Sequence, residues 1–413
     1  MLFLNNRLNA CYDFARMSLI MNEKQNTNTR LISDEKSGFK ISDEFERFNQ
    51  INDIFSRAFW DDSVRNKQSD AFFESHRVQP KGKRAVGFKQ KDFALRNASW
   101  ALSDTFSDRN AHKGNREGFQ SWMENDSLIA DEKIKIDDQK SFTIEFKKIA
   151  KLFGADLIGI TPIDKRWHYS KKVNTLEFKP VSNKLPGNFT SVIVMGHAMD
   201  KGLVDTYPSA LASSAAGFEY SREAAIVTQM TTYIRSLGYE ALGSMNDTAL
   251  VIPYAIQAGL GEYGRHQMVI TPEFGPRVRF SKIFTTLPLH HDKPKHHGIT
   301  EYCNKCTKCA DACPPKALPK GPPSYNVINR STIKGVKKWS ANCEKCFDYW
   351  TKLRTDCAIC MRVCPFNRDF NSFRGKIFWK IATSFLQPVA LWWEKKRGIP
   401  KRLKPDAWWQ MQQ

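Results

Sequence analysis

The sequence predicts a mixed α/β (α+β) fold that continues into a small cysteine-rich domain. Two observations lead to this prediction. Between residues 141 and 290, segments with helical periodicity alternate with short apolar runs, which is typical of helices packed against a sheet. Nine of the ten cysteines lie between Cys303 and Cys364, so one short stretch concentrates a different kind of chemistry.

The elements of the α/β region follow in chain order. Short apolar runs predict strands at residues 155–160, 191–195 and 280–289. A long helix is expected at residues 221–237, with Gly238 as its stop. An earlier helix is expected before Gly154, which suits its C-terminal stop. Apolar residues recur there at i, i+3, i+4 and i+7 on one face: Phe146, Ile149, Ala150 and Phe153.

The 413 residues are enough for two or three domains, and 41% hydrophobic residues allow a sizeable core. The first third of the N-terminal region is polar and charged, and we expect it to be disordered. Four regions are expected: a polar N-terminal wrap with irregular structure and short helices at 1–140, the α/β domain at 141–295, the cysteine-rich domain at 296–370 and a basic, Trp-rich tail at 371–413.

The first cysteine run has the spacing of bacterial ferredoxins, in which three close cysteines hold one [4Fe–4S] cube and the fourth reaches a second. It reads Cys303-x₂-Cys306-x₂-Cys309-x₃-Cys313-Pro314. The second run, Cys357-x₂-Cys360-x₃-Cys364-Pro365, lacks its leading cysteine because Arg354 stands there. Either Cys346 or Cys343 must replace it. The sequence therefore predicts a bacterial-type two-[4Fe–4S] ferredoxin domain with crossed ligands: Cys303, Cys306, Cys309 and Cys364 for one cluster, and Cys313, Cys357, Cys360 and Cys346 or Cys343 for the other.

Other uses of the cysteines fit less well. Structural zinc rarely takes a third cysteine at x₂ and a fourth at x₃ before proline, twice over. Disulfides would require a secreted chain. No Cys-x-x-Cys is followed by histidine, which excludes covalent c-type haem, and Cys11 stands alone as an ordinary thiol. A nearby histidine-rich stretch could bind metal, but its flanking lysines and proline favour an exposed loop: His290, His291, His296 and His297.

The composition bears on location and partners. Free thiols and oxygen-sensitive clusters favour a reducing compartment, and the first 21 residues lack both a long apolar core and a twin-arginine start, so we expect a cytoplasmic protein. The formal charge of +20 suits nucleic acid, an anionic membrane surface or acidic partners. The tail is expected to pack its aromatics over the cluster domain, with weak membrane-surface contact as the alternative: Trp379, Trp392, Trp393, Trp408 and Trp409.

Two further segments of the α/β region stand out. The stretch 258–265 carries Gly259, Gly261 and Gly264, which would let the backbone approach a cofactor closely. It does not open a helix after a clear strand and has no Gly-Lys-Ser/Thr, so it is neither a dinucleotide fingerprint nor a P-loop, and a tight turn is the alternative. In the stretch 271–279, Arg277 and Arg279 flank a turn and could bind an anion or lie on the surface.

Together with the cysteines, five segments resemble the reductive dehalogenases over roughly residues 90–410. They are Tyr220-Ser221-Arg222, Asn246-Asp247-Thr248, the glycine stretch 258–265, Gly275-Pro276-Arg277-Val278-Arg279 and Lys345-Cys346-Phe347-Asp348-Tyr349-Trp350. The last match favours Cys346 over Cys343 as the eighth ligand.

The resemblance implies a nitroreductase-like domain that buries a corrinoid, a base-off cobamide, beside one cluster. No Asp-x-His-x-x-Gly motif is present to supply a histidine lower ligand. The implied reaction is reductive cleavage of a carbon–halogen bond in an organohalide, with electrons delivered through both clusters. By resemblance, Tyr220 precedes the long helix and donates the proton, Arg279 lowers the pKa of that phenol, and Asn246 positions a haloalkene substrate.

The sequence departs from the family in two respects. It shows no twin-arginine export signal and no reductase domain after the clusters, so a separate electron donor such as a ferredoxin, flavodoxin or reductase is expected. Epoxyqueuosine reductase, which acts on tRNA, is the nearest alternative, because Asp247 falls near that family's catalytic aspartate. A non-catalytic iron–sulfur electron-transfer subunit is the second, but it leaves the middle domain unexplained.

Overall fold

The central sheet has four strands in the order β2-β5-β9-β6, and every neighbouring pair is antiparallel. The strands are β2 (Leu157–Pro162), β5 (Ser191–Ala198), β9 (Val278–Thr285) and β6 (Ala241–Ser244). This computed structural model describes residues 37–411 apart from 79–80 and 83–84, so the expected disordered first third and Cys11 lie largely or wholly outside the described residues. The mixed class is confirmed in its α+β form, because no strands are parallel in this sheet.

Side-chain alternation along the strands gives the sheet two apolar faces. On β9, Phe280 and Phe284 belong to one core, and Ile283 belongs to the other. Arg279 is four residues from Ile283 and therefore shares its face. The sequence located three of the four strands to within a few residues. Strand β6 was missed because Leu242 is the one large side chain in Ala241–Ser244 and the segment shows no alternation.

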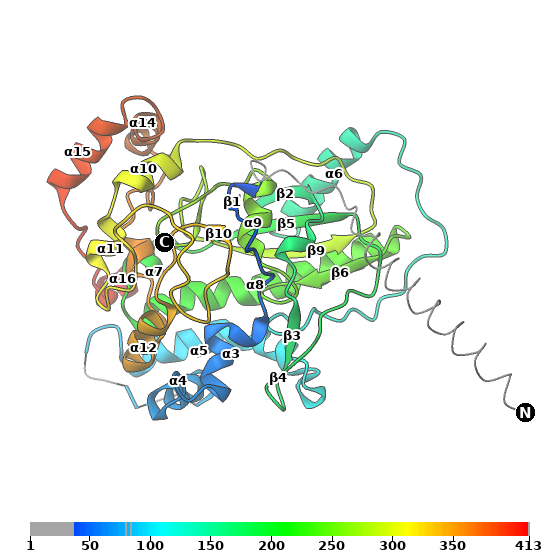
Figure 1. Ribbon diagram of the computed structural model, residues 1–413, viewed down its shortest axis with the longest axis horizontal. Coiled ribbons are helices and arrows are strands. Elements are labelled where there is room, and N and C mark those ends of the chain that lie inside the picture. The colour runs from blue at the N-terminus through cyan, green and yellow to red at the C-terminus, as the bar shows by residue number, and fades with distance from the viewer. Residues whose placement is uncertain (1–36, 79–80, 83–84, 412–413) are drawn as a thin grey trace, which may run out of the picture. The chain divides into compact units, whose positions relative to one another are not determined.

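The helix that covers the Ile283 face is α8 (Ala210–Ser236), which lies along the sheet in Figure 1. Ser209 caps its start by accepting from the Ala212 amide at 3.0 Å, and the left-handed Gly238 follows its end. The helix begins eleven residues before the expected Ser221. Its first two turns are small, buried residues on nearly every side, so no amphipathic period marks them. Tyr220 is therefore inside the helix, not before it.

The N-terminal region is more helical than expected. It contains η1 (Gln50–Asn52), α3 (Ile54–Trp60), α4 (Lys67–Arg77), η2 (Ala111–Lys113) and α5 (Gln90–Asp108), which at 19 residues is not a short helix. Helix α5 packs closely on α8, as Figure 1 shows. A Cβ on Gly217 would lie 2.1 Å from the Ser99 hydroxyl oxygen, so glycine is what allows this close approach.

The cysteine-rich domain consists of short helices joined by loops. They are α10 (Ile299–Lys305), α11 (Lys308–Ala312), α12 (Cys343–Leu353) and α13 (Ile359–Arg362). Its strand β10 (Val336–Lys337) pairs antiparallel with β1 (Lys40–Ile41), which ties the N-terminal region to the cysteine domain. The other elements are α6 (Gln139–Leu152), η3 (Lys165–Trp167), β3 (Lys171–Asn174), β4 (Lys179–Ser182), α7 (Lys201–Asp205), α9 (Val251–Gln257), β7 (Glu262–Tyr263) and β8 (Val269–Ile270).

The tail forms α14 (Phe373–Ala382), α15 (Gln387–Arg397) and α16 (Pro405–Gln410). Phe378 and Ala390 are buried in the core that contains Tyr302 and Phe366 of the cysteine domain. In Figure 1, α14 and α15 lie beside α10. Trp379 packs on this core, as expected, whereas Trp392 is 61% exposed and Trp408 and Trp409 pack mainly beside α7 and the start of α8. No described helix combines the length and the hydropathy needed to cross a membrane.

Candidate functional site

A cavity of about 1020 Å³ lies between the N-terminal helices, α8 and α12. That volume is at or just above the upper end for sites that hold a drug-sized ligand. Its wall is strongly aromatic: Phe48, Phe55, Phe59, Phe72, Phe73, Trp100, Phe119, Trp167, Tyr169, Phe178, Tyr220, Tyr263 and Trp350.

The three residues assigned catalytic roles from the sequence meet in this wall. The Asn246 amide donates to the Tyr220 hydroxyl at 2.6 Å, and Arg279 donates to the Asn246 side-chain oxygen at 3.2 Å. The Arg279 guanidinium carbon lies 3.4 Å from the centre of the Tyr220 ring. Because Asn246 donates to the phenol oxygen, the phenol hydrogen remains available to a partner in the cavity.

Each member comes from a different element. Tyr220 is on α8, Arg279 is on β9, and Asn246 is in the turn after β6. The Tyr220 ring stacks on Trp100 and Phe119, with ring centres at 4.4 and 5.3 Å. These contacts fix the position of the ring, and the hydrogen bond from Asn246 orients its hydroxyl.

The pKa of Tyr220 lies above its usual value, although Arg279 was expected to lower it. Burial raises the pKa of this phenol above its usual value, and the carboxyl of Glu223 raises it further. Arg279 and Asn246 lower it, as expected for the arginine, but they do not overcome burial. Tyr220 is thus protonated throughout the neutral range, which suits a proton donor.

Glu223 is a further member of this group that the sequence pattern did not reveal. It is fully buried one turn after Tyr220 on α8, and it accepts from Arg279 Nε at 2.6 Å. Its second oxygen has no hydrogen-bond partner, and burial raises its pKa. The i, i+3 spacing of Tyr220 and Glu223 was the available signal, but it was hidden while Tyr220 was placed outside the helix.

Asp247 does not line the cavity. Its carboxylate is fully buried and accepts from the Met245 amide at 2.9 Å and from the Thr248 hydroxyl. Lys282 lies near it, and burial lowers the pKa of that lysine to about 8. Asp247 thus holds its own turn together and, with it, the backbone that presents Asn246.

The thiols of the two cysteine runs interleave. Around Cys364 of the second run, the thiols that act on its charge are Cys303, Cys309 and Cys306 of the first run. Such a group supports the crossed assignment to one cluster. The ligand set itself stays a prediction.

A second group forms around Cys360, whose neighbours include Cys346, Cys357 and Cys313. Cys343 has a different environment: it lines the cavity, and its charged neighbours are led by Lys338 and Asp53. The packing therefore favours Cys346 over Cys343 as the eighth ligand. Trp350, one turn after Cys346 on α12, also lines the cavity, so this second group adjoins it.

The buried, closely spaced thiols are better suited to binding iron than to remaining free in the protein interior. Burial raises the pKa of nearly all of them: Cys303, Cys306, Cys309, Cys346, Cys357, Cys360 and Cys364. For all of these except Cys306, the charge of neighbouring thiolates raises the pKa further. Described cysteines form no disulfides. Iron would lower both costs, because it binds the thiolate and offsets part of its charge.

The glycine stretch packs against protein. A Cβ would lie 2.4 Å from the Lys293 carbonyl at Gly259, 2.4 Å from the Ile270 carbonyl at Gly261 and 2.8 Å from the His266 ring at Gly264. None of the three lines the cavity, although Tyr263 does. Tight packing of the β7–β8 hairpin accounts for these glycines, and their contact with a cofactor stays a prediction.

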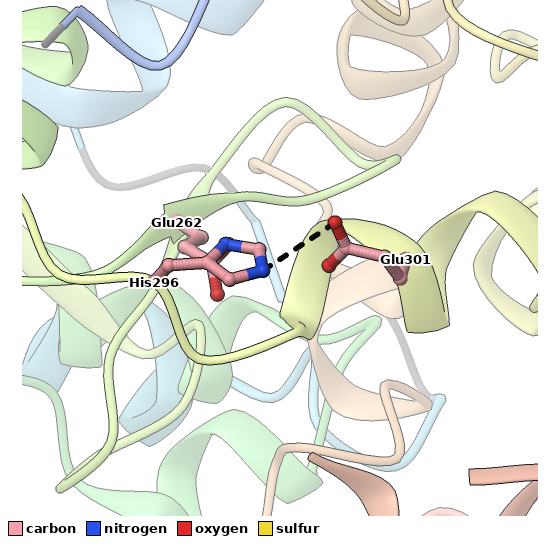
Figure 2. Close-up of side chains that lie close together, drawn as sticks. All are labelled: Glu262, His296 and Glu301. Carbon is pink, nitrogen blue, oxygen red and sulfur yellow. Dashed lines mark ion pairs between the residues drawn. The ribbon is translucent and has the colours of Figure 1, made fainter. Parts of the chain in front are cut away.

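Figure 2 shows the group of possible metal ligands that the described residues bring together: Glu262, His296 and Glu301. His296 lies between the carboxylates, at 3.0 Å from Glu262 and 3.6 Å from Glu301. Glu262 already accepts from the His297 and Ile299 amides, and His296 is 70% exposed. Glu262 therefore caps the start of α10 from the buried strand β7, with the exposed His296 beside it. Arg277 is neither exposed nor free for an anion, because it is buried and donates to the Met199 and Arg368 carbonyls.

The buried Tyr–Asn–Arg group thus lies in the wall of an aromatic cavity that adjoins one of the two cysteine groups. Residues 302–367 match the 4Fe-4S double cluster binding domain, and residues 172–289 match the reductive dehalogenase subunit family. The resemblance to reductive dehalogenases is confirmed.

Individual relatives agree. The tetrachloroethene reductive dehalogenase of Sulfurospirillum multivorans is 32% identical over 298 residues, which is 66% of this chain and 60% of that protein. A solved structure of a reductive dehalogenase described as B12-dependent matches 90% of this chain and 49% of its own, with a TM-score of 0.69 at 21% identity, and so shares the fold. The epoxyqueuosine reductase of Lactococcus garvieae is 28% identical over 152 residues, 32% of this chain and 37% of that protein.

Proposed function

We propose that this protein is a corrinoid-dependent reductive dehalogenase. The observation that carries the proposal is a cavity with two distinct walls. On one, the Tyr220 hydroxyl is oriented by Asn246 with its hydrogen available. The other adjoins the second cysteine group through Trp350 and Cys343. A proton donor and an electron source would thus adjoin the same cavity.

The size and lining of the cavity support a large cofactor. A small organohalide would occupy a minor part of about 1020 Å³, which leaves room for a flat macrocycle among aromatic side chains. The residues that would hold it are aromatic groups from three regions: Phe55 and Phe59 of α3, Tyr169, and Trp350 of α12. When bound, a base-off cobamide would supply strongly reducing cobalt chemistry.

The chain's own residues would manage the proton. The overall change is R–X + 2 e⁻ + H⁺ → R–H + X⁻, so the cavity must deliver one proton as halide leaves. Tyr220 gives up its phenol proton, and the positive Arg279 beneath the ring stabilises the tyrosinate. Glu223 holds Arg279 in place through its 2.6 Å contact. The raised pKa keeps the proton on Tyr220 until a substrate needs it.

Electrons would enter at the cluster of Cys303, Cys306, Cys309 and Cys364 and leave from the other, because only the second group adjoins the cavity. We propose a separate donor of the ferredoxin, flavodoxin or reductase kind and, from the reduced thiols, a cytoplasmic location. Weak membrane-surface contact would fall to the exposed side of α15, where Trp392 and Trp393 stand beside Lys395 and Lys396.

The substrate proposed is an organohalide small enough to reach Tyr220 beside a cofactor, and a haloalkene would meet the Asn246 amide. The structure gives no support to a tRNA substrate, because Asp247 faces its own turn. The test is anaerobic reconstitution with iron, sulfide and a cobamide, followed by halide release from a panel of haloalkenes and halophenols under low-potential reductant. Stoichiometric corrinoid with halide release is expected. A protein that takes up no corrinoid, or that reduces only an epoxyqueuosine-containing RNA, would refute the proposal.

A further inference from the structure

The β7–β8 hairpin holds helix α10 at both of its ends. Glu262 accepts from the His297 and Ile299 amides at the start of α10, at 2.8 and 3.0 Å. Arg265, three residues later, donates to the Cys303 carbonyl at 2.9 Å and the Cys306 carbonyl at 2.8 Å near its end. A negative group at the N-terminus and a positive one at the C-terminus match the dipole of the helix.

Arg265 is bound only to carbonyls. Its Nη1 donates to Pro319 and Gly321 at 2.9 and 2.7 Å, and its Nη2 also reaches Asn304 at 3.1 Å. Within the described part of the chain, every hydrogen-bond acceptor found for this side chain is a neutral backbone oxygen of the loop that carries the first cysteine run. Trp339 lies against the guanidinium, with 5.1 Å between its ring centre and Cζ.

The side chain of Arg265 is 1% exposed. A buried cation is costly unless an opposite charge lies near, and carbonyl dipoles offset only part of that cost. Arg265 donates to the backbone carbonyls of Cys303 and Cys306 themselves, which places its charge beside two of the thiolates assigned to the first cluster.

We propose that Arg265 is the counter-charge of the cluster held by Cys303, Cys306, Cys309 and Cys364, and that it raises the reduction potential of that cluster. Reduction adds one negative charge to a cluster that is already anionic. A fixed cation beside it favours the reduced state, and net charge and hydrogen bonding are the usual means by which proteins tune such clusters. Arg265 thus positions α10 and also stabilises the negative charge of the reduced cluster. The inference rests on the cluster assignment of the proposed function.

The test is a pair of substitutions at Arg265, read by iron content and by redox titration of each cluster under electron paramagnetic resonance. Arg265→Gln keeps hydrogen-bond donors and removes the charge. It should make the first cluster about tenfold harder to reduce at a given potential, a shift of about 59 mV for one electron. Arg265→Lys keeps the charge and loses the fork, so it should shift the equilibrium less. Cys346→Ser assigns the signals by removing the second cluster.

The control variants distinguish an effect of the charge of Arg265 from a general disruption of the structure. In Arg265→Gln the second cluster should titrate as in the unmodified protein. Arg277→Gln removes another buried arginine that donates to carbonyls but has no cysteine among its charged neighbours, and both potentials should stay in place. Unchanged potentials in Arg265→Gln with both clusters present would overturn the proposal. If Arg265→Gln fails to bind the first cluster, Arg265→Lys distinguishes the two explanations. Loss of the first cluster in Arg265→Lys as well would show that Arg265 acts through geometry and not through charge. An unmodified protein without clusters would instead refute the proposed function.

Discussion

At the scale of single residues, the site depends on how burial and charge oppose one another. Tyr220 is buried, which keeps its proton on, and Arg279 lies beneath its ring, which makes the loss of that proton less costly. Glu223 accepts from Arg279 and would otherwise be an unpaired buried carboxylate. These three groups therefore work as one unit, and changing any of them changes the acidity of the phenol.

Replacing Tyr220 by phenylalanine should abolish most of the proton delivery. Tyr220→Phe preserves the stack on Trp100 and Phe119 and removes only the hydroxyl. General acid catalysis typically contributes about 10²–10⁴-fold, so the rate of halide release should fall within that range while iron and corrinoid contents stay normal. Tyr239→Phe is the control, because its hydroxyl bonds the Ile134 carbonyl and does not line the cavity. Normal turnover by Tyr220→Phe would show that another group supplies the proton.

The two candidate eighth ligands should behave differently. Cys346→Ser should lose one cluster, about half of the iron, because Cys346 packs among the thiols of Cys313, Cys357 and Cys360. Cys343→Ser should retain both clusters, since Cys343 lines the cavity and its charged neighbours are led by Lys338 and Asp53. Iron and sulfide analysis of both variants decides the matter. The opposite result would transfer the ligand role to Cys343.

At the scale of elements, the contact between α5 and α8 positions the site. Trp100 of α5 reaches Tyr220 of α8 only because the two helices approach closely at Gly217. The hairpin β7–β8 plays the corresponding part for the clusters by holding α10 through Glu262 and Arg265. In both places a local packing arrangement fixes a side chain that takes part in redox chemistry or proton transfer.

Filling the α5–α8 contact should weaken the fold. A Cβ at Gly217 would lie 2.1 Å from the Ser99 hydroxyl and 2.6 Å from Trp100 Cδ1, so one helix must shift. Gly217→Ala should lower the free energy of unfolding by about 1–3 kcal/mol despite the better helix propensity of alanine. Gly321→Ala is the comparison, because nothing lies within 4 Å of its Cβ. Equal stabilities of the two variants in urea titration would contradict this view of the contact.

At the scale of the whole molecule, the interior holds histidines in their neutral form. Burial lowers the pKa of four of them to about 3 or 4: His76, His168, His197 and His266. In the unfolded chain each would titrate near 6.5. Below that pH the unfolded state binds more protons than the folded state, so stability falls as pH falls from about 6.5 toward 4.

The unfolding midpoint should therefore drop when the pH is lowered from 7.5 to 5.5. Each histidine contributes at most about 1.4 kcal/mol per pH unit in that window. His197→Gln removes one of these groups, which contacts the Ser281 hydroxyl at 2.9 Å, and its stability should depend less on pH than that of the unmodified protein. Anaerobic thermal scans at both pH values measure the difference. Identical pH dependence in the two proteins would exclude His197 from the effect.

The order of residues along the chain was enough to predict the chemistry that depends on spacing. The two cysteine runs indicated a two-cluster domain, and short apolar runs located β2, β5 and β9. Tyr220, Asn246 and Arg279 were found by resemblance, although they are up to 59 positions apart. Other features of the site depend on burial and on contacts between distant elements, so they became clear from the folded structure. The start of α8 had no periodic signal because it is buried on nearly all sides, so Tyr220 was misplaced and Glu223 overlooked. Desolvation sets the direction of the pKa shift of Tyr220. Packing between distant elements places Cys343 at the cavity and surrounds Arg265 with carbonyls. Neither effect can be read from the order of residues.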